Sequence, residues 1–427
     1  MRRVIITDDS HIHPFNEPAR DLRVLNKPLW LHQRDLLSPY TTEEREYPNW
    51  DIAQRAEGQE KVEALAHRDN LFFNQTLIEE FITRARAGHQ PVRLAFRADD
   101  PAVTAHMLPL AHSFQRKGEL VLAEMWYLPQ GISQSFIAKP LVIDTESREI
   151  GYYHVPPYMA TETGDLVYQL PRKAFVSLES WTHVFIIDIL FGVFARGIIT
   201  EEKVDRDWRF KLRILFRAIM EQRQVLDTSE VVRVGNNVSI DPTAIIHGMT
   251  TIGNNVNIGP GVVIDNCIIG DNVNVTQGCQ LMLSVVADGC FLPFRASLFM
   301  TTLMERSMVA QNTCLQLCVV GRDSFIGAGS TFTDFNVVPA PLRAYGKEGL
   351  EETGMIVLGG CVGHHCRLSS GLYMMPARTI ESDVVLLAND ERSFIQKNIS
   401  YEESDHHQFI GKYDYPRLYP RKGEQLG

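Results

Sequence analysis

A repeat of apolar residues with a period of 17 residues runs through the middle of this chain. Within each period the apolar residues follow one another in steps of six, six and five. The first members of five consecutive periods are Ile252, Ile269, Val286, Leu303 and Val320. A fixed period of this kind indicates a solenoid, in which each unit buries its apolar face against its neighbours. No other feature of the sequence constrains the fold as strongly.

Three evenly spaced apolar residues per period predict a three-sided coil with one short strand on each side. Val, Ile and Thr are frequent on the walls and favour extended backbone. The residue after a wall position is often Gly, as at Gly253 and Gly327, and Asn or Asp often follows, as at Asn254 and Asn255. Gly, Asn and Asp tolerate the positive φ that tight corners need. Similar blocks extend the coil upstream to Val234 and downstream to Ile380. Residues 333–355 break the pattern with Pro, Gly and charged residues, which predicts a loop excluded from the coil.

Composition narrows the class of protein. The chain has 427 residues, 44% of them hydrophobic, and a formal net charge of −10, which argues against nucleic-acid binding. All seven cysteines lie between Cys267 and Cys366 without a CxxC pair, so we expect small wall residues in a reducing, cytoplasmic compartment. The first residues turn polar at once, unlike a secretory signal. The longest apolar run, Val184–Phe194, contains Asp188 and is too short to span a bilayer, so it predicts a buried helix and no transmembrane segment.

Four regions follow along the chain. Residues 1–200 alternate strand and helix signals, which predicts an α/β domain with a largely parallel sheet. Its expected elements are strands Arg3–Thr7, Val92–Phe96 and Leu120–Tyr127 and helices Thr76–Ala87 and Val103–Gln115. Residues 201–228 predict one long amphipathic linking helix, either packed between domains or lying on a membrane surface. Residues 229–390 form the predicted solenoid, and the tail 391–427 has one His pair without a second ligand pair, so we predict no metal site.

Two stretches carry a family resemblance. The sequence IGAGSTFTDFN at Ile326–Asn336, followed after the loop by LGGCVGHHCRLSSGLYMMPARTI at Leu358–Ile380, resembles the hexapeptide-repeat acyltransferases. The sequence PARDLRVLNKPLWL at Pro18–Leu31 resembles the segment after the first strand of sugar nucleotidyltransferases. The whole chain resembles a divergent branch of the bifunctional N-acetylglucosamine-1-phosphate uridylyltransferase/glucosamine-1-phosphate acetyltransferase family. This resemblance implies a degenerate nucleotidyltransferase-like, Rossmann-like domain, then a left-handed parallel β-helix of hexapeptide repeats, and a homotrimer.

The N-terminal domain departs from that family where a nucleotide would bind. Nucleotidyltransferases have a Gly-rich loop after the first strand, whose backbone N–H groups approach the phosphates closely. Here Asp8–Phe15 contains no Gly, Ala19 stands at the position of the family lysine, and Glu17 replaces a basic residue. Asp8 or Asp9 could hold Mg²⁺, although a strand-end Asp pair is more often a turn or cap. We therefore expect a domain that binds a sugar nucleotide without turning it over.

Acyl transfer from coenzyme A needs a general base and N–H donors for the thioester oxyanion. His365 follows the excluded loop, is expected to point outward and falls on the family's G-x-H position, so we predict that it is the catalytic base. His364 is a weaker candidate or an orienting partner, and His247 is expected to be a solvated turn residue. Gln311 aligns near the catalytic His of the best-known relatives and cannot act as a base.

The resemblance also predicts side chains that bind substrate and cofactor. Those expected to bind the substrate are Arg295, Asp334, Asn336, Arg343 and Arg367, and Arg378 is expected to bind the cofactor. The predicted function is an acyltransferase that uses acetyl-CoA or another acyl-CoA and acts on a phosphorylated or nucleotide-linked amino sugar. The alternatives are an active bifunctional enzyme, which would need Mg²⁺, and a non-catalytic scaffold or regulatory subunit. Coenzyme A binding distinguishes them, because a scaffold does not need it.

Overall fold

The computed structural model describes residues 1–58, 60–132, 137–153, 165–222, 224–338, 340–390, 392–409 and 415–424. The chain divides into two compact units. The first comprises 1–12 and 17–183, and the second comprises 13–16 and 184–427. Four residues near the N-terminus, His13–Asn16, therefore belong to the C-terminal unit.

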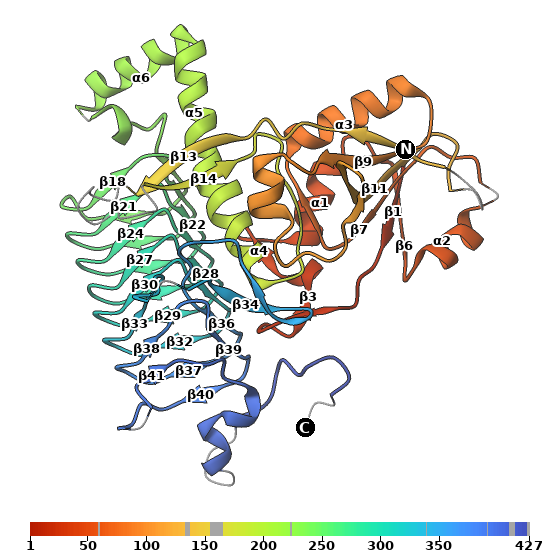
Figure 1. Cartoon of the computed structure of the whole chain (residues 1–427). Coiled ribbons are helices and arrows are strands. Elements are labelled where there is room, and N and C mark those ends of the chain that lie inside the picture. Colours follow the sequence, from red (N-terminus) through yellow and green to blue (C-terminus); the bar gives the residue numbers. More distant parts are fainter. Residues whose placement is uncertain are drawn as a thin grey trace. The chain divides into compact units, whose positions relative to one another are not determined.

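The second unit contains a parallel β-helix of three eight-stranded sheets (Figure 1). The first sheet consists of β16 (Arg233–Val234), β19 (Thr251–Ile252), β22 (Ile268–Ile269), β25 (Val285–Val286), β28 (Thr302–Leu303), β31 (Val319–Val320), β36 (Cys361–Val362) and β39 (Thr379–Ile380). The second consists of β17 (Ser239–Ile240), β20 (Asn257–Ile258), β23 (Asn274–Val275), β26 (Phe291–Leu292), β29 (Met308–Val309), β32 (Phe325–Ile326), β37 (Arg367–Leu368) and β40 (Val385–Leu386). The third consists of β18 (Ile245–His247), β21 (Val263–Asp265), β24 (Gln280–Met282), β27 (Ser297–Phe299), β30 (Cys314–Gln316), β33 (Thr331–Phe332), β38 (Tyr373–Met374) and β41 (Phe394–Ile395). This arrangement is consistent with the predicted hexapeptide-repeat β-helix.

The interior of the coil confirms the apolar repeat. Every predicted apolar position from Ile252 to Phe332 belongs to one buried cluster. The cysteines are free thiols, and all except the partly buried Cys314 are fully enclosed, as expected for wall residues. Val234 and Ile240 lie in the first coil, which has a neighbouring coil on one side only, and they are 47% and 38% exposed.

The structure shows which of the predicted corner residues adopts the positive φ. Positive φ occurs at Asn255, which lies two residues after Gly253, and not at Gly253 itself. A Cβ atom on Gly253 would lie 2.6 Å from the backbone of Gly270 in the next coil and 2.3 Å from Asp271 Oδ1. Glycine is therefore required there because adjacent coils approach closely, while the short side chain of Asn255 tolerates the left-handed backbone.

An inserted segment separates two consecutive coils. Val320 of β31 pairs with Val362 of β36, so a whole segment between β33 and β36 leaves the stack. It contains a hairpin of β34 (Arg343–Gly346) and β35 (Gly349–Glu352). The segment rejoins the coil where the backbone N–H of Leu358 donates to the carbonyl oxygen of Asp334 at 2.8 Å.

The first unit is an α/β unit around a seven-stranded sheet. Its strands follow the order β12 (Lys139–Val142), β9 (Val92–Arg97), β11 (Leu120–Leu128), β7 (Ala64–Arg68), β1 (Arg2–Ile6) and β6 (Glu43–Tyr47), with β10 (Gln115–Lys117) paired to β11. Its helices are α1 (Leu29–Leu37), α2 (Trp50–Glu57) and α3 (Gln75–Gly88). Shorter paired strands are β2 (His11–Ile12), β3 (Glu17–Pro18), β4 (Arg23–Val24), β5 (Lys27–Pro28), β8 (Leu71–Phe73), β13 (Arg148–Tyr153), β14 (Leu166–Leu170) and β15 (Phe175–Ser177). The sheet is mixed and not largely parallel, because β11 runs antiparallel to both β7 and β9.

Two predicted helices end early. The helix expected over Val103–Gln115 is a π-helical turn at Val103–Met107, and Pro109, which has no N–H group to donate, cannot continue the helical hydrogen bonds. The long linking helix is broken into α5 (Ala195–Arg206) and α6 (Trp208–Glu221), followed by a short turn at Val225–Asp227. Asp207 causes the break, since its carboxylate caps α6 by accepting from the N–H groups of Arg209 and Phe210 at 3.0 and 3.3 Å.

The apolar run of the sequence forms a buried helical segment, as predicted. It begins with α4 (Trp181–Phe185) and continues as a π-helix over Ile186–Phe194, where Asp188 accepts a hydrogen bond from Thr302 at 2.9 Å. The combined stretch Trp181–Arg206 is the one helix in the described ranges that is long and apolar enough to cross a membrane. Most of its apolar window, 67%, is buried inside the protein, as in a core helix.

Candidate functional site

His365 forms a carboxylate–imidazole pair with a residue of the next coil. It lies at the corner between β36 and β37, and its φ of 54° is left-handed. Its Nδ1 lies 2.9 Å from Oδ1 of Asp383, which occupies the equivalent corner one coil later and is fully buried. The imidazole keeps 14% of its surface exposed and points outward, while Val362 and Cys366 on either side of it are fully buried. A carboxylate that fixes one ring nitrogen leaves the other available for proton transfer.

The C-terminal tail holds this pair from the outside. The ring of Tyr415 stacks on the His365 imidazole with centroids 4.5 Å apart and planes 4° apart. The Tyr415 hydroxyl also donates to the backbone carbonyl of His365, and burial raises the pKa of that hydroxyl. The backbone N–H of Tyr419 donates to Oδ2 of Asp383 at 2.7 Å. Both oxygens of the buried Asp383 carboxylate are therefore satisfied, and the imidazole has a fixed orientation.

The side chain of His364 packs in the interior of the second unit. It is fully buried, and its Nδ1 accepts from the backbone N–H of Arg322 at 2.9 Å. Phe15 stacks on its ring at 4.9 Å, and Tyr419 lies 4.7 Å away. Asp383, and not His364, therefore orients the His365 ring.

Residues 13–16, which overlap the end of the segment Asp8–Phe15 considered above, are bound to the last coils of the second unit. The carbonyl oxygen of Pro14 accepts from the backbone N–H and the hydroxyl of Ser382 at 3.0 and 2.9 Å. Gly363 makes room for this contact, since a Cβ atom there would lie 2.8 Å from the Pro14 carbonyl oxygen. The Asn16 amide donates to Glu381 at 2.8 Å. This segment is therefore engaged in packing within the second unit.

The buried carboxylate of Glu381 binds residues from near both ends of the chain within the second unit. Besides Asn16, its carboxylate accepts from Arg421 Nε at 2.7 Å and from the backbone N–H of Tyr401 at 3.0 Å. Burial alone would raise the pKa of Glu381, but the hydrogen bonds from Arg421 and Asn16 lower it below its ordinary value. The group is therefore a structural carboxylate with its charge fully compensated.

The structure brings some of the predicted binding residues together and separates others. Arg367 follows His365 on the same edge and donates to the carbonyl oxygen of Asp323. Arg343 and Arg378 meet at the inserted hairpin, where Arg378 donates to the Arg343 carbonyl oxygen at 3.3 Å. Arg343 itself pairs with Glu352 at 3.2 Å, which reduces its availability for a phosphate.

The remaining predicted residues lie elsewhere on the coil. Asp334 and Asn336 begin the inserted segment; burial raises the pKa of Asp334, and the Asn336 amide donates to Ala340 at 3.3 Å. Arg295 lies at a corner between the second and third sheets, in a small cavity of about 420 Å³ with Gln277, Gly278, Phe294 and Asn312. Arg295 thus occupies a different edge of the coil from His365.

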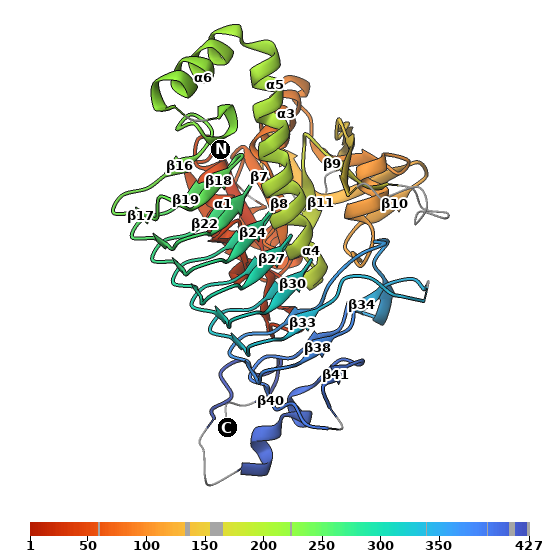
Figure 2. The same cartoon turned by 90° about the vertical axis from the view of Figure 1, so that its left-hand side faces the viewer.

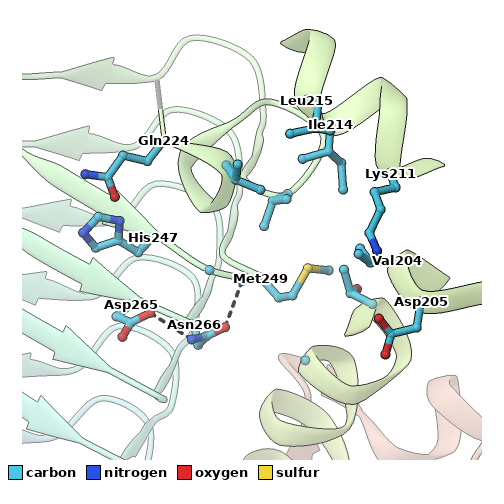
Figure 3. Close-up of a pocket in the computed structure, with 15 residues that line it drawn as sticks. Val204, Asp205, Lys211, Ile214, Leu215, Gln224, His247, Met249, Asp265 and Asn266 are labelled. Atoms are coloured by element: carbon cyan, nitrogen blue, oxygen red, sulfur yellow. Dashed lines mark hydrogen bonds between the residues drawn. The ribbon is translucent and has the colours of Figure 1, made fainter. Parts of the chain in front are cut away.

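A second carboxylate–imidazole pair lies beside a larger pocket. His247 Nδ1 bonds to Asp227, and the His247 side chain is 35% exposed. The pocket measures about 800 Å³ and is lined by both apolar and polar side chains. Figure 3 shows His247, Asp265 and Asn266 on the solenoid side and Lys211 and Leu215 on the helical side. The sequence indicated only a solvated turn for His247, and its partner Asp227 lies before the regular repeat, where no periodicity could reveal it.

The acidic residues that lie next to the end of β1 in the first unit are bound to neighbouring residues. Asp8 pairs with Arg68 at 3.0 Å and accepts from the N–H of Ser10 at 2.9 Å. Oδ1 of Asp69 accepts from the N–H of Asp8 at 2.9 Å, and burial raises the pKa of Asp69 to about 7. Within the residues that the structure describes, no group of three His, Cys, Asp or Glu side chains could hold a metal ion. Asp8 thus acts as a turn and ion-pair residue.

Comparisons with known proteins give partial similarities. No curated protein matches the chain. A UDP-N-acetylglucosamine acyltransferase from Campylobacter jejuni is 14% identical over 34% of this chain and 56% of its own, with a TM-score of 0.25. A mutant of perosamine N-acetyltransferase from Caulobacter crescentus, solved with CoA and GDP-perosamine, is 16% identical over 36% of this chain and 53% of its own, with a TM-score of 0.16. The matches thus span about half the length of each of these two proteins. A family model matches residues 232–266, so this stretch of the chain carries the hexapeptide repeat of bacterial transferases.

Proposed function

We propose that the second unit is an acyl-CoA-dependent acyltransferase with His365 as its general base. The observation that carries this proposal is the 2.9 Å contact between His365 Nδ1 and the buried Asp383 carboxylate. The hexapeptide-transferase repeat at residues 232–266 supports the reaction class. The acceptor is proposed to be a phosphorylated or nucleotide-linked amino sugar, as the resemblance implies.

The chemistry follows from the orientation of the imidazole. Asp383 accepts the Nδ1–H of His365, so Nε2 has the lone pair that removes a proton from the acceptor amine. The amine nitrogen attacks the thioester carbonyl carbon, forming a C–N bond and a tetrahedral oxyanion. Collapse of this intermediate breaks the C–S bond, and the proton passes from His365 to the departing thiolate. The buried carboxylate stabilises the transient imidazolium, and base catalysis of this kind contributes about 10²- to 10⁴-fold.

Acyl-CoA is a co-substrate in this proposal and brings the anionic phosphates that the site must bind. Arg378 is assigned to the cofactor, while Arg295, Asp334, Asn336, Arg343 and Arg367 are assigned to the acceptor. The contact between Arg378 and the Arg343 backbone supports a shared role for these two at the inserted hairpin. Arginine suits phosphate groups because its planar fork donates two parallel hydrogen bonds.

For the first unit we propose retained binding of a sugar nucleotide without turnover. Two observations support the loss of chemistry: Asp8 is paired with Arg68, and residues 13–16 are packed on the coil of the second unit. Mg²⁺ would be needed only if this unit were active. Turnover of UTP with a sugar 1-phosphate by the full chain would contradict this part of the proposal.

The first test is calorimetric titration of the protein with acetyl-CoA, followed by assays on amino-sugar phosphates. We expect acetyl-CoA to bind the wild type and the His365→Ala variant equally, because the base does not hold the cofactor. Turnover should fall about 10²- to 10⁴-fold in His365→Ala and less in Asp383→Asn. The absence of binding to acetyl-CoA and longer acyl-CoAs would favour a non-catalytic scaffold.

His247→Ala is the matched control, because the imidazole of His247 also pairs with a carboxylate. His247 also lines the pocket of about 800 Å³, so it is the alternative candidate for the catalytic base of the same reaction. Loss of turnover in His247→Ala with full activity in His365→Ala would move the catalytic centre to that pocket and overturn the assignment of His365.

A further inference from the structure

Helix α6 has two apolar faces, and only one of them is packed. Phe210 and Ile214 are buried and form a small cluster with Val231, against which Val204 and Met249 also pack. This contact anchors α6 beyond the first coil of the stack, as Figure 1 and Figure 2 show. The opposite face of the helix is open to solvent.

The open face is large and continuous. Six apolar side chains are between 45% and 76% exposed: Trp208, Leu212, Leu215, Phe216, Ile219 and Met220. At 3.6 residues per turn they fall within an arc of about 140° on the helix. Scattered apolar residues are normal on a protein surface, but a contiguous stripe of this size marks an interaction site.

Basic side chains flank this stripe. Arg209, Lys211, Arg213 and Arg217 are all exposed, whereas Glu221 is the one acidic residue within α6. Arg213 and Arg217 reach the carboxylate of Glu230 only at 3.9 and 3.8 Å, which is too long for a tight ion pair. The helix is thus locally cationic, although the whole protein has a net charge of −10.

We propose that α6 binds the surface of an anionic phospholipid membrane, with its apolar stripe inserted at the boundary between headgroups and acyl chains. A helix with Trp, Phe and Leu on one face and flanking Lys and Arg is suited to this position, because the long basic side chains reach the phosphates while their stems stay apolar. Charge complementarity favours this partner over a second copy of α6, since pairing two such helices would oppose four cations with four cations. The inference is independent of the catalytic assignment.

The test is co-sedimentation of the full-length protein with vesicles of phosphatidylcholine alone and of phosphatidylcholine mixed with phosphatidylglycerol. We expect binding to the mixed vesicles at low salt and much weaker binding to the neutral ones or at high salt. The Arg209→Gln/Arg213→Gln variant should bind about 25-fold more weakly, given the typical contribution of each basic residue near such a surface. Arg116→Gln/Lys117→Gln, two exposed cations elsewhere in the chain, is the matched control and should bind normally.

The apolar contribution is tested in the same way. Leu212→Ser/Ile219→Ser should lose most binding, while Val337→Ser/Val338→Ser, a more exposed apolar pair on the inserted segment, should not. All variants should keep the wild-type melting temperature, since every changed side chain is exposed. Equal affinity for neutral and anionic vesicles, or no binding, would overturn the proposal. So would a fall in the solution mass of Leu212→Ser/Ile219→Ser without vesicles, because the stripe would then be a contact between copies.

Discussion

His13 is a half-buried histidine near the N-terminus that contacts the last coils of the second unit. Its Nε2 lies 2.9 Å from the Thr379 hydroxyl, and its ring lies 4.8 Å from that of Tyr345. Burial lowers the pKa of His13 to about 4; nearby Glu381 opposes this effect and Arg421 adds to it. The neutral imidazole is therefore part of the folded structure.

This pKa predicts a loss of stability in mild acid. The folded pKa is lower than the unfolded value of about 6.5, so the stabilisation is complete above pH 6.5 and is lost as the pH falls towards about 4. Its full size is on the order of 3 kcal/mol. Melting temperatures of wild type and His13→Gln between neutral pH and pH 4.5 should converge in acid. The difference between the two proteins is the relevant measure, because burial also lowers the pKa values of His67 and His106 in the first unit. A constant difference over this range would show that His13 does not titrate on unfolding.

The sequence could reveal His365 and its carboxylate partner, but not the more distant groups that contact this part of the coil. The position of His365 after a wall residue indicated that it points outward. This coil has 18 residues, from Val362 to Ile380, and the same step leads from His365 to Asp383, so a strict count along the repeat could have reached Asp383. Tyr415 and His13 were not, because they are 50 and 366 residues away in sequence from the groups they bind, and no local pattern encodes such contacts.

At the level of the coil, stability depends on neighbouring coils on both sides. Ile326 in β32 is fully buried between two coils, whereas Ile240 in β17 lies in the first coil and is partly exposed. We expect Ile326→Ala to lower the free energy of unfolding by about 2–5 kcal/mol and Ile240→Ala by less than about 1 kcal/mol. Urea denaturation followed by circular dichroism measures both. Equal effects would contradict the nearest-neighbour account of this solenoid.

The elements of the repeating coil could be predicted from the sequence, whereas a helix boundary set by a single residue could not. The 17-residue period located the coil walls correctly because each wall residue must be buried by the next coil. One side chain, Asp207, divides the linking segment into two helices by capping α6, and the periodicity of the flanking apolar residues continues across it. The local sequence pattern of a strand does not show the direction in which the strand runs in the sheet. For this reason the sequence did not predict that β11 is antiparallel to its neighbours.

For the whole molecule, the distribution of exposed apolar residues bears on assembly. The outward residues of the first sheet are buried along much of its length, as at Ile268, Val285, Thr302, Val319 and Cys361. The third sheet instead exposes Met282, Tyr373 and Phe394, and the last two stack at 5.1 Å. Aromatic residues and Met on an open sheet face are typical of the core of a protein–protein interface.

We therefore expect the homotrimer that the family resemblance implies, with the third sheet in the interface. Light scattering should give a mass of three times 48.4 kDa, about 145 kDa. The Tyr373→Asp/Phe394→Asp variant should dissociate to monomers, because two carboxylates would be buried without partners. Val337→Asp, also on an exposed apolar residue, is the control and should remain trimeric. A monomeric wild type would contradict the prediction. If the dissociated variant retained acyl transfer at full rate, the His365 site would be complete within one subunit, and assembly would serve stability and not catalysis.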